Sequence, residues 1–423
     1  MAEPPVPATS TTIPSGPKSR RFYVPQLDGL RFLAFLLVFV HHGPRMSALL
    51  PRGSMGHSFL AFLETFGWCG VDLFLVLSAF LITSLLLIEY DRYRNISLRG
   101  FYMRRILRIW PLYYLMTAIG FFLLPWLSLF AYPLHSPQHA QLMKDHFLAY
   151  CTLFGNFSSG AHSYATIGTL AHLWTVTLEE QFYIVWPLTL SLMLRVRRVA
   201  LWALLGALLI GTVTLRMCLI GHAPHPYIWT NTLARLDPLL VGIAIALWRH
   251  SHTPRPGWLV PAMKLAVGLV LVGSIARGRP IETQSKDIGW EFLATAGGFG
   301  FILDAILSQG RNPLSWLLSR RPLVWLGKLT YGLYVYHILG FQIGKEVVDF
   351  LHGRQVATSA TALLVLRSII SLVITIGIAA ESYRIFESFF LRLKDRFSRV
   401  KSRPVDAQSA SPTSAIPPVP NVA

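Results

Sequence analysis

The sequence predicts an all-α protein, a polytopic transmembrane bundle of about ten helices with both termini in the cytoplasm. Three observations lead to this fold class. Hydrophobic residues make up 53% of the chain and charged residues only 14%, against about 25% charged in a typical soluble domain. About ten apolar segments are long enough to cross a bilayer. Lys and Arg are also distributed unequally between alternate connections.

The predicted spans divide the chain into one membrane domain and two tails. Residues 1–21 and 396–423 are rich in Pro, Ser, Thr or Ala, the latter after a basic start, and are predicted to be disordered. A transmembrane domain is expected over 22–395. Its apolar segments lie near 27–43, 68–88, 109–130, 172–194, 199–220, 229–248, 258–275, 289–308, 322–343 and 361–383.

The charge distribution orients the bundle. With the N-terminus in the cytoplasm, 24 of the 38 Lys and Arg residues fall on the cytoplasmic side and 8 on the outer side. The net charge of +18 is therefore explained by topology rather than by nucleic-acid binding, which is not expected. The three cysteines are far apart and form no CxxC pair, so neither a disulfide framework nor a zinc site is predicted.

The longest connection, near 131–170, falls on the outer side in this topology. Its four histidines, His135, His139, His146 and His162, are more typical of solvated loop side chains than of metal ligands. No metal is expected.

The first predicted span contains ionisable residues on one helical face. Arg31 and His42 are eleven residues apart, which is about three turns and roughly 16 Å along a helix. Asp28 lies close to the same stripe. Ionisable groups inside a span indicate function by default. The alternative, equally weighted here, is that Arg31 snorkels to the membrane surface and His42 ends the helix.

Carboxylates occur in two further spans. Asp72 is followed only by apolar residues as far as Ser78, so it is expected to pair with an Arg or His of another span. A hydrated position at the membrane surface is the alternative. Glu179 and Glu180 are adjacent and point in different directions on a helix, so at least one needs a partner or a polar cavity.

A basic cytoplasmic loop precedes the third span. Arg104 and Arg108 are one helical turn apart and share a face, with Arg105 beside them. Guanidinium groups bind phosphates through paired donors, so a phosphate-rich donor such as coenzyme A would suit this loop. Binding of anionic lipid head groups is the favoured alternative for the loop taken alone.

Further ionisable residues lie in later spans. They are Arg235, Asp237, Glu291, Asp304 and His337. So many ionisable groups inside apolar segments predict a polar cavity within the bundle rather than a passive anchor.

Five of these segments, taken in order, resemble acyltransferase family 3, whose members include O-acetylases of O-antigen, exopolysaccharide and Nod factors. The similarity runs from about residue 23 to 391. The matching segments are 27–31 with the interval to His42, 70–74, 101–109, 173–183 and 334–337. Each motif is weak alone, and five in register are specific.

Two positions and one short segment depart mildly from the family pattern. Ala79 stands where the family commonly has Gly, and Thr175 stands where Ser is usual. Residues 386–389 read Phe-Glu-Ser-Phe, where Glu, a basic residue, Pro and Phe are commoner. None of these changes removes a polar residue of the motifs.

The resemblance implies O-acyl transfer, most simply of an acetyl group, from cytoplasmic acyl-CoA to a hydroxyl of a carbohydrate or glycosylated acceptor. His42 is the candidate base, since imidazole titrates near neutrality. Asp72 or Glu179 would orient it, and Arg31 would position the donor or stabilise charge. CoA phosphates would be bound by Arg104, Arg105 and Arg108. The resemblance also implies the plasma (inner) membrane of a bacterium, and it leaves open whether an acyl-enzyme forms.

Two other functions remain open from the sequence. A secondary transporter can use intramembrane charges as a proton relay, although no internal repeat of the kind many transporters show is evident. An inactive scaffold would have no need for costly buried charges. Release of CoA from acetyl-CoA distinguishes the enzyme from the transporter.

Overall fold

The computed structural model describes residues 23–130, 132–196, 198–252, 257–275, 288–308, 313–354 and 359–400. Over these ranges the fold is helical and contains no strand, as the all-α prediction requires. Each of the ten predicted apolar segments holds a helix. These helices are α1 (Pro25–His42), α3 (Gly70–Tyr93), α4 (Leu98–Ala118), α10 (Trp174–Met193), α11 (Arg198–Leu219), α13 (Asp237–Ser251), α14 (Leu259–Ile275), α15 (Ile288–Ile306), α17 (Arg321–Gly353) and α18 (Ala360–Ser382).

Shorter helices connect them or lie at their ends. They are α2 (Met55–Phe66), α5 (Leu124–Trp126), α6 (Pro137–Leu142), α7 (Leu148–Cys151), α8 (Gly155–His162), α9 (Gly168–Ala171), α12 (Tyr227–Thr230), α16 (Pro313–Leu318) and α19 (Ser388–Asp395). A π-helical turn at Tyr383–Glu387 joins α18 to α19.

Four helical stretches of the described chain are long and apolar enough to cross a membrane, and they mark a membrane protein. They are Met55–Tyr93, Leu98–Trp126, Val199–Leu219 and Thr361–Asp395. Some of the other helices at predicted spans are shorter than the ~20 residues that a full span needs; α13 has 15 residues and α14 has 17. Ten spans with both termini in the cytoplasm therefore stay a prediction.

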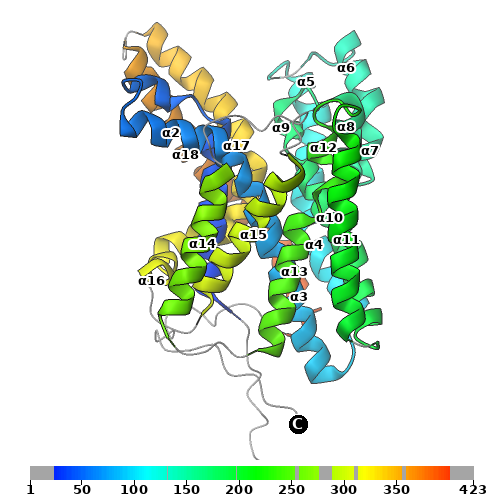
Figure 1. The fold of residues 1–423 in the computed structure, drawn as a ribbon. Coiled ribbons are helices and arrows are strands. Elements are labelled where there is room, and N and C mark those ends of the chain that lie inside the picture. The colour runs from blue at the N-terminus through cyan, green and yellow to red at the C-terminus, as the bar shows by residue number, and fades with distance from the viewer. Residues whose placement is uncertain are drawn as a thin grey trace, which may run out of the picture.

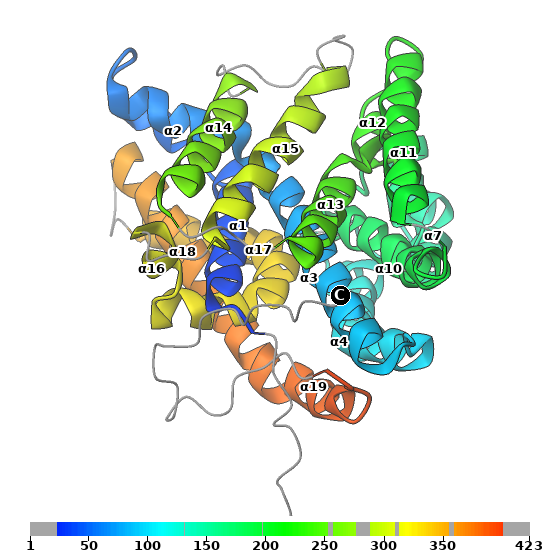
Figure 2. The same cartoon turned by 60° about the horizontal axis from the view of Figure 1, so that its bottom comes forward.

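The helices form two groups that meet along α1, α3, α13 and α15. Figure 1 shows α2, α17 and α18 on one side of the upper part of the molecule and α5 to α8 on the other. Helix α1 packs against α17 and α3, and α3 in turn packs against α13. Figure 2 shows α19 at the lower end of the bundle, where it contacts α4.

Close backbone contacts fix the position of α1. A side chain at Gly327 of α17 would collide with the backbone of Asp28, and one at Gly70 would collide with the carbonyl oxygen of Ala34. Glycine removes the Cβ atom at both places, so α17 and α3 can approach α1 directly. Pro25 lies in the first turn of α1, where its missing N–H leaves no hydrogen bond unmade.

The connection near 131–170 is more ordered than its composition indicates. His139 and His146 are buried, which corrects the prediction that these histidines are solvated. His139 Nε2 lies 2.9 Å from the carbonyl oxygen of Phe121, and His146 Nδ1 lies 2.7 Å from the hydroxyl of Ser158. His139 therefore ties α6 to the segment Ile119–Leu123 that follows α4, and His146 ties the segment Met143–Phe147 to α8. His135 and His162 are exposed, as predicted.

The predicted tails lie mostly outside the described residues, which begin at Tyr23 and end at Val400. Residues 396–400, assigned to the C-terminal tail from composition, continue the packing of α19 against α4. The guanidinium of Arg104 donates to the carbonyl oxygen of Phe397 at 2.7 Å.

Candidate active site

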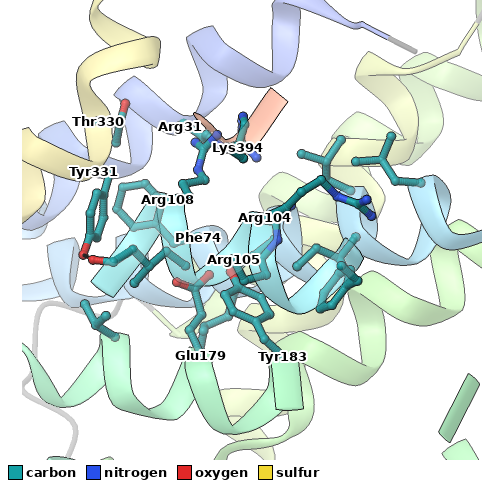
Figure 3. A pocket seen from close by; sticks show the side chains of 18 of the residues that line it. Arg31, Phe74, Arg104, Arg105, Arg108, Glu179, Tyr183, Thr330, Tyr331 and Lys394 are labelled. Carbon is teal, nitrogen blue, oxygen red and sulfur yellow. Dashed lines mark hydrogen bonds between the residues drawn. The ribbon is translucent and has the colours of Figure 1, made fainter. Parts of the chain in front are cut away.

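A basic cavity of about 160 Å³ lies where α1, α3, α4, α10, α17 and α19 meet. Its lining includes five cations, contributed by three helices: Arg31, Arg104, Arg105, Arg108 and Lys394. Figure 3 shows Arg31, Arg108 and Lys394 gathered on one side, with Glu179 and Tyr183 opposite them. The structure therefore brings Arg31, Glu179 and the three arginines of the basic loop to one site.

Helix α4 positions the arginine cluster. Ser97 begins the helix by accepting a hydrogen bond from the N–H of Gly100, a standard N-cap. Arg104 is partly engaged by the Glu89 carboxylate at 3.4 Å. The Arg105 guanidinium lies 5.5 Å from the centre of the Tyr183 ring, within range of a cation–π contact. Its Nε has no hydrogen-bond partner among the described residues.

Arg31 enters the same cavity from the N-terminal half of α1. Its guanidinium lies 3.3 Å from the Asp28 carboxylate, and Asp28 also accepts a hydrogen bond from the Tyr23 hydroxyl at 2.9 Å. The Asp28 and Tyr23 side chains therefore fix where Arg31 points. Because Asp28 neutralises part of its charge, Arg31 can remain in this low-dielectric setting.

The side chains of the two adjacent glutamates of α10 point in different directions, as the sequence predicts. Glu180 accepts a hydrogen bond from the indole of Trp110 at 2.7 Å. Glu179 lines the basic cavity together with Arg31 and Arg105. Beside it, the hydroxyls of Ser78 and Tyr183 are hydrogen bonded to each other.

A second cavity, of about 420 Å³, contains His42. His42 is exposed to this space, whereas His172 and His337 beside it are buried. The ring centres of His42 and His337 are 5.1 Å apart, and those of His172 and His337 are 4.7 Å apart. Three histidines from α1, the loop before α10, and α17 therefore form one cluster.

The hydrogen bonds of the cluster assign the tautomer of His42. His337 Nδ1 lies 2.5 Å from the carbonyl oxygen of Tyr334, so it is the protonated nitrogen, and Nε2 of a neutral His337 is an acceptor. His42 Nδ1 faces two acceptors, this Nε2 at 3.3 Å and the Val38 carbonyl oxygen at 3.1 Å. Nδ1 of His42 therefore carries the proton, which leaves the Nε2 lone pair free to accept one.

Neither predicted orienting carboxylate contacts His42. Asp72 is fully buried and forms an ion pair with Arg235, which confirms the expected pairing with a cation of another helix. The prediction that Asp72 orients His42 is wrong, because its carboxylate is engaged elsewhere. Glu179 lies in the basic cavity rather than beside the histidines. The Val38 carbonyl and His337 orient His42 instead.

The two cavities share a wall. Val71, Thr175 and Tyr334 line both of them. The Tyr334 hydroxyl lies 2.7 Å from the Thr175 hydroxyl and donates to the carbonyl oxygen of His172 at 3.1 Å. The hydrogen-bonded pair of Thr175 and Tyr334 thus separates the arginine cluster from the histidine cluster. Through Tyr334 it is also hydrogen bonded to the backbone of His172, a member of the histidine cluster.

Sequence reasoning did not single out every residue of this site. In the sequence His337 is a polar residue within an apolar span with no indicated role, and Tyr334 is only part of a motif. Lys394 follows the last predicted span and carried no signal beyond its charge. His172 stands at the start of a predicted span, where a histidine at a helix end has an ordinary structural explanation.

The helical bundle and its paired cavities suit a membrane transferase. A family model described as an acyltransferase domain matches residues 24–380. The chain therefore belongs to acyltransferase family 3, as its motifs predict, and to a class of acyltransferase enzymes.

Two curated relatives carry names that refer to peptidoglycan. The "Putative peptidoglycan O-acetyltransferase YrhL" of Bacillus subtilis is 31% identical over 326 residues, covering 74% of this chain and 48% of the relative. The "Peptidoglycan O-acetyltransferase OatA" of Listeria monocytogenes is 27% identical over 380 residues, covering 87% and 56%. The chain spans about half the length of these relatives. No solved structure matches it.

Proposed function

We propose that the protein is an O-acetyltransferase of the bacterial plasma membrane, which moves an acetyl group from acetyl-CoA to a hydroxyl of a cell-wall or other surface glycan. The observation that carries this proposal is the shared wall of the two cavities. One cavity holds cations suited to a polyphosphate donor, and the other holds an oriented imidazole suited to an acceptor hydroxyl. The names of the relatives support a glycan acceptor.

The donor occupies the basic cavity in this proposal. Arg104, Arg105 and Arg108 bind the phosphates of CoA, and Lys394 adds a fifth cation to the lining. Arg31 positions the donor, and Glu179 holds Arg31 and Arg105 in place through its charge. The acyl-bearing arm of CoA then passes Val71, Thr175 and Tyr334 to reach the histidine cavity.

The transfer step uses His42 as general base. Its Nε2 takes the proton of the acceptor hydroxyl while the hydroxyl oxygen attacks the thioester carbonyl carbon. The carbon–sulfur bond breaks, and the proton passes from His42 to the leaving sulfur to give CoA thiol and the acetyl ester. His337 and the Val38 carbonyl hold the imidazole in the required tautomer. General-base catalysis by a well-positioned imidazole contributes about 10²–10⁴-fold to the rate.

Loss of acetyl groups from a surface glycan tests the proposal. The gene is deleted and then restored as wild type, as His42→Ala or as His252→Ala, an exposed histidine at the end of α13. Mass spectrometry of isolated glycans is expected to show O-acetyl ester lost on deletion. Wild type and His252→Ala restore it, and His42→Ala does not. Full acetylation with His42→Ala, or no lost ester on deletion, contradicts the proposal.

A further inference from the structure

The histidine cavity contains hydrogen-bond donors that the acyl-transfer step does not use. Arg235 and Trp229 both line this cavity. Nε and Nη1 of Arg235 and Nε1 of Trp229 are buried, and none has a hydrogen-bond partner within the described chain. Arg235 itself is fully buried. Buried polar groups are nearly always paired in proteins, so unpaired donors on residues that line the same cavity as His42 indicate a ligand with acceptor oxygens.

The charge of this cluster favours an uncharged ligand. Nη2 of Arg235 donates to the Asp72 carboxylate, so the pair is neutral as a unit. The nearby Asp237 carboxylate is occupied by Arg216, with nitrogen–oxygen distances of 2.7 and 2.9 Å. The basic cavity differs, since its five cations exceed its two carboxylates, Glu89 and Glu179. The neutral pair of Arg235 and Asp72 therefore does not attract an anion. Its free N–H groups can instead bind uncharged hydroxyl, ring or amide oxygens.

Aromatic rings surround Arg235 and line the histidine cavity beside it. The Arg235 guanidinium lies 3.6 Å from the centre of the Phe292 ring and 5.1 Å from that of Trp229, and these contacts fix the direction of its free N–H groups. Trp68 and Trp174 also line the cavity. Flat apolar faces next to a few directed donors are the features of a site that orients a small polar ring.

We infer that Arg235 and Trp229 form a recognition site for an uncharged sugar residue of the acceptor, and hold its oxygens while a neighbouring hydroxyl faces His42. This inference rests on the proposed acetyl transfer and names the chemistry of its acceptor. Asp72 then acts through Arg235: it neutralises the guanidinium and directs one edge of it away from the ligand.

Two conservative variants remove the donors and keep the surroundings. Arg235→Lys retains a cation opposite Asp72 but loses the Nε and Nη1 donors, and Trp229→Phe retains an aromatic ring without the indole N–H. The matched controls are Arg249→Lys, whose native side chain pairs with Asp304 away from the cavity, and Trp258→Phe at an exposed position. All four are purified in detergent and compared with wild type.

The probe is chitopentaose, an uncharged oligomer of N-acetylglucosamine, and its binding is measured by equilibrium dialysis. Arg235→Lys and Trp229→Phe are each expected to weaken binding and to raise the acceptor KM by at least about 5-fold, the ratio for one lost hydrogen bond. The KM for acetyl-CoA stays unchanged, and the controls behave as wild type. The cationic pentamer of glucosamine is expected to bind at least 10-fold more weakly than chitopentaose.

The dialysis separates this inference from the proposed function. If wild type binds chitopentaose but releases no CoA from acetyl-CoA, and the variants bind it more weakly, the recognition site stands and acetyl transfer fails. If wild type does not bind chitopentaose, or binds the charged pentamer as well, the inference is wrong. Unchanged binding by both Arg235→Lys and Trp229→Phe also overturns it.

Discussion

Removal of the Asp72 carboxylate is expected to destabilise the protein because it leaves Arg235 as an unpaired buried charge. The side chains of the pair are 0% and 1% exposed. Asp237 cannot replace Asp72, because Arg216 already binds both of its carboxylate oxygens. Breaking a buried ion pair from one side costs about 3–5 kcal/mol. Asp72→Leu should therefore lower the free energy of unfolding by that amount.

A double variant provides the control for this prediction. Asp72→Leu with Arg235→Met removes both charges, so it should recover most of the lost stability, since apolar replacements of a buried pair are often neutral or better. Thermal unfolding in detergent is measured for the four members of the cycle. If Asp72→Leu unfolds at the wild-type temperature, the reasoning that an unpaired Arg235 destabilises the fold is refuted.

Three further predictions concern the donor cavity, the base and the packing of α1. Lys394→Ala should raise the KM for acetyl-CoA about 5-fold, since one charge-assisted contact is lost. The control Arg392→Ala, on the exposed face of α19, should leave this KM unchanged. Equal KM values for both variants would exclude Lys394 from donor binding. His337→Phe should lower kcat about 5-fold, the ratio for one lost hydrogen bond, and leave the KM values for acetyl-CoA and for the acceptor unchanged. An unaltered kcat in steady-state kinetics would contradict the role of His337 in orienting His42. Gly327→Leu should lower the thermal unfolding temperature by forcing α17 away from Asp28; an unchanged temperature would show that this contact can relax freely.

Much of the fold follows from the sequence because lipid as a solvent imposes simple rules on it. Long apolar segments predict helices, and helices occur at all ten predicted positions. The order of the 131–170 connection was not predictable, because hydrogen bonds such as that of His139 to the Phe121 carbonyl depend on tertiary contact. Composition reports the polarity of such a residue but not its partner.

The candidate site was predicted in its residue types more than in its geometry. The helical spacing of Arg31 and His42 places them on one face at different depths, and the structure assigns them to two cavities that share a wall. The partners of Asp72 and His42 could not be read from the sequence. Arg235 is 163 positions from Asp72 in the sequence, and His337 is 295 positions from His42. These two pairings therefore depend on how α3 and α17 pack against other helices.

We propose that donor binding and base catalysis occupy adjacent but separate cavities. Purified His42→Ala protein tests it directly, with ¹³C-acetyl-CoA as donor, chitopentaose as acceptor, and donor binding and labelled ester measured on one sample. We expect wild-type affinity for acetyl-CoA together with a loss of ester formation of about 10²-fold or more. Undiminished ester formation, or loss of donor binding with His42→Ala, would contradict the division of labour between the two cavities.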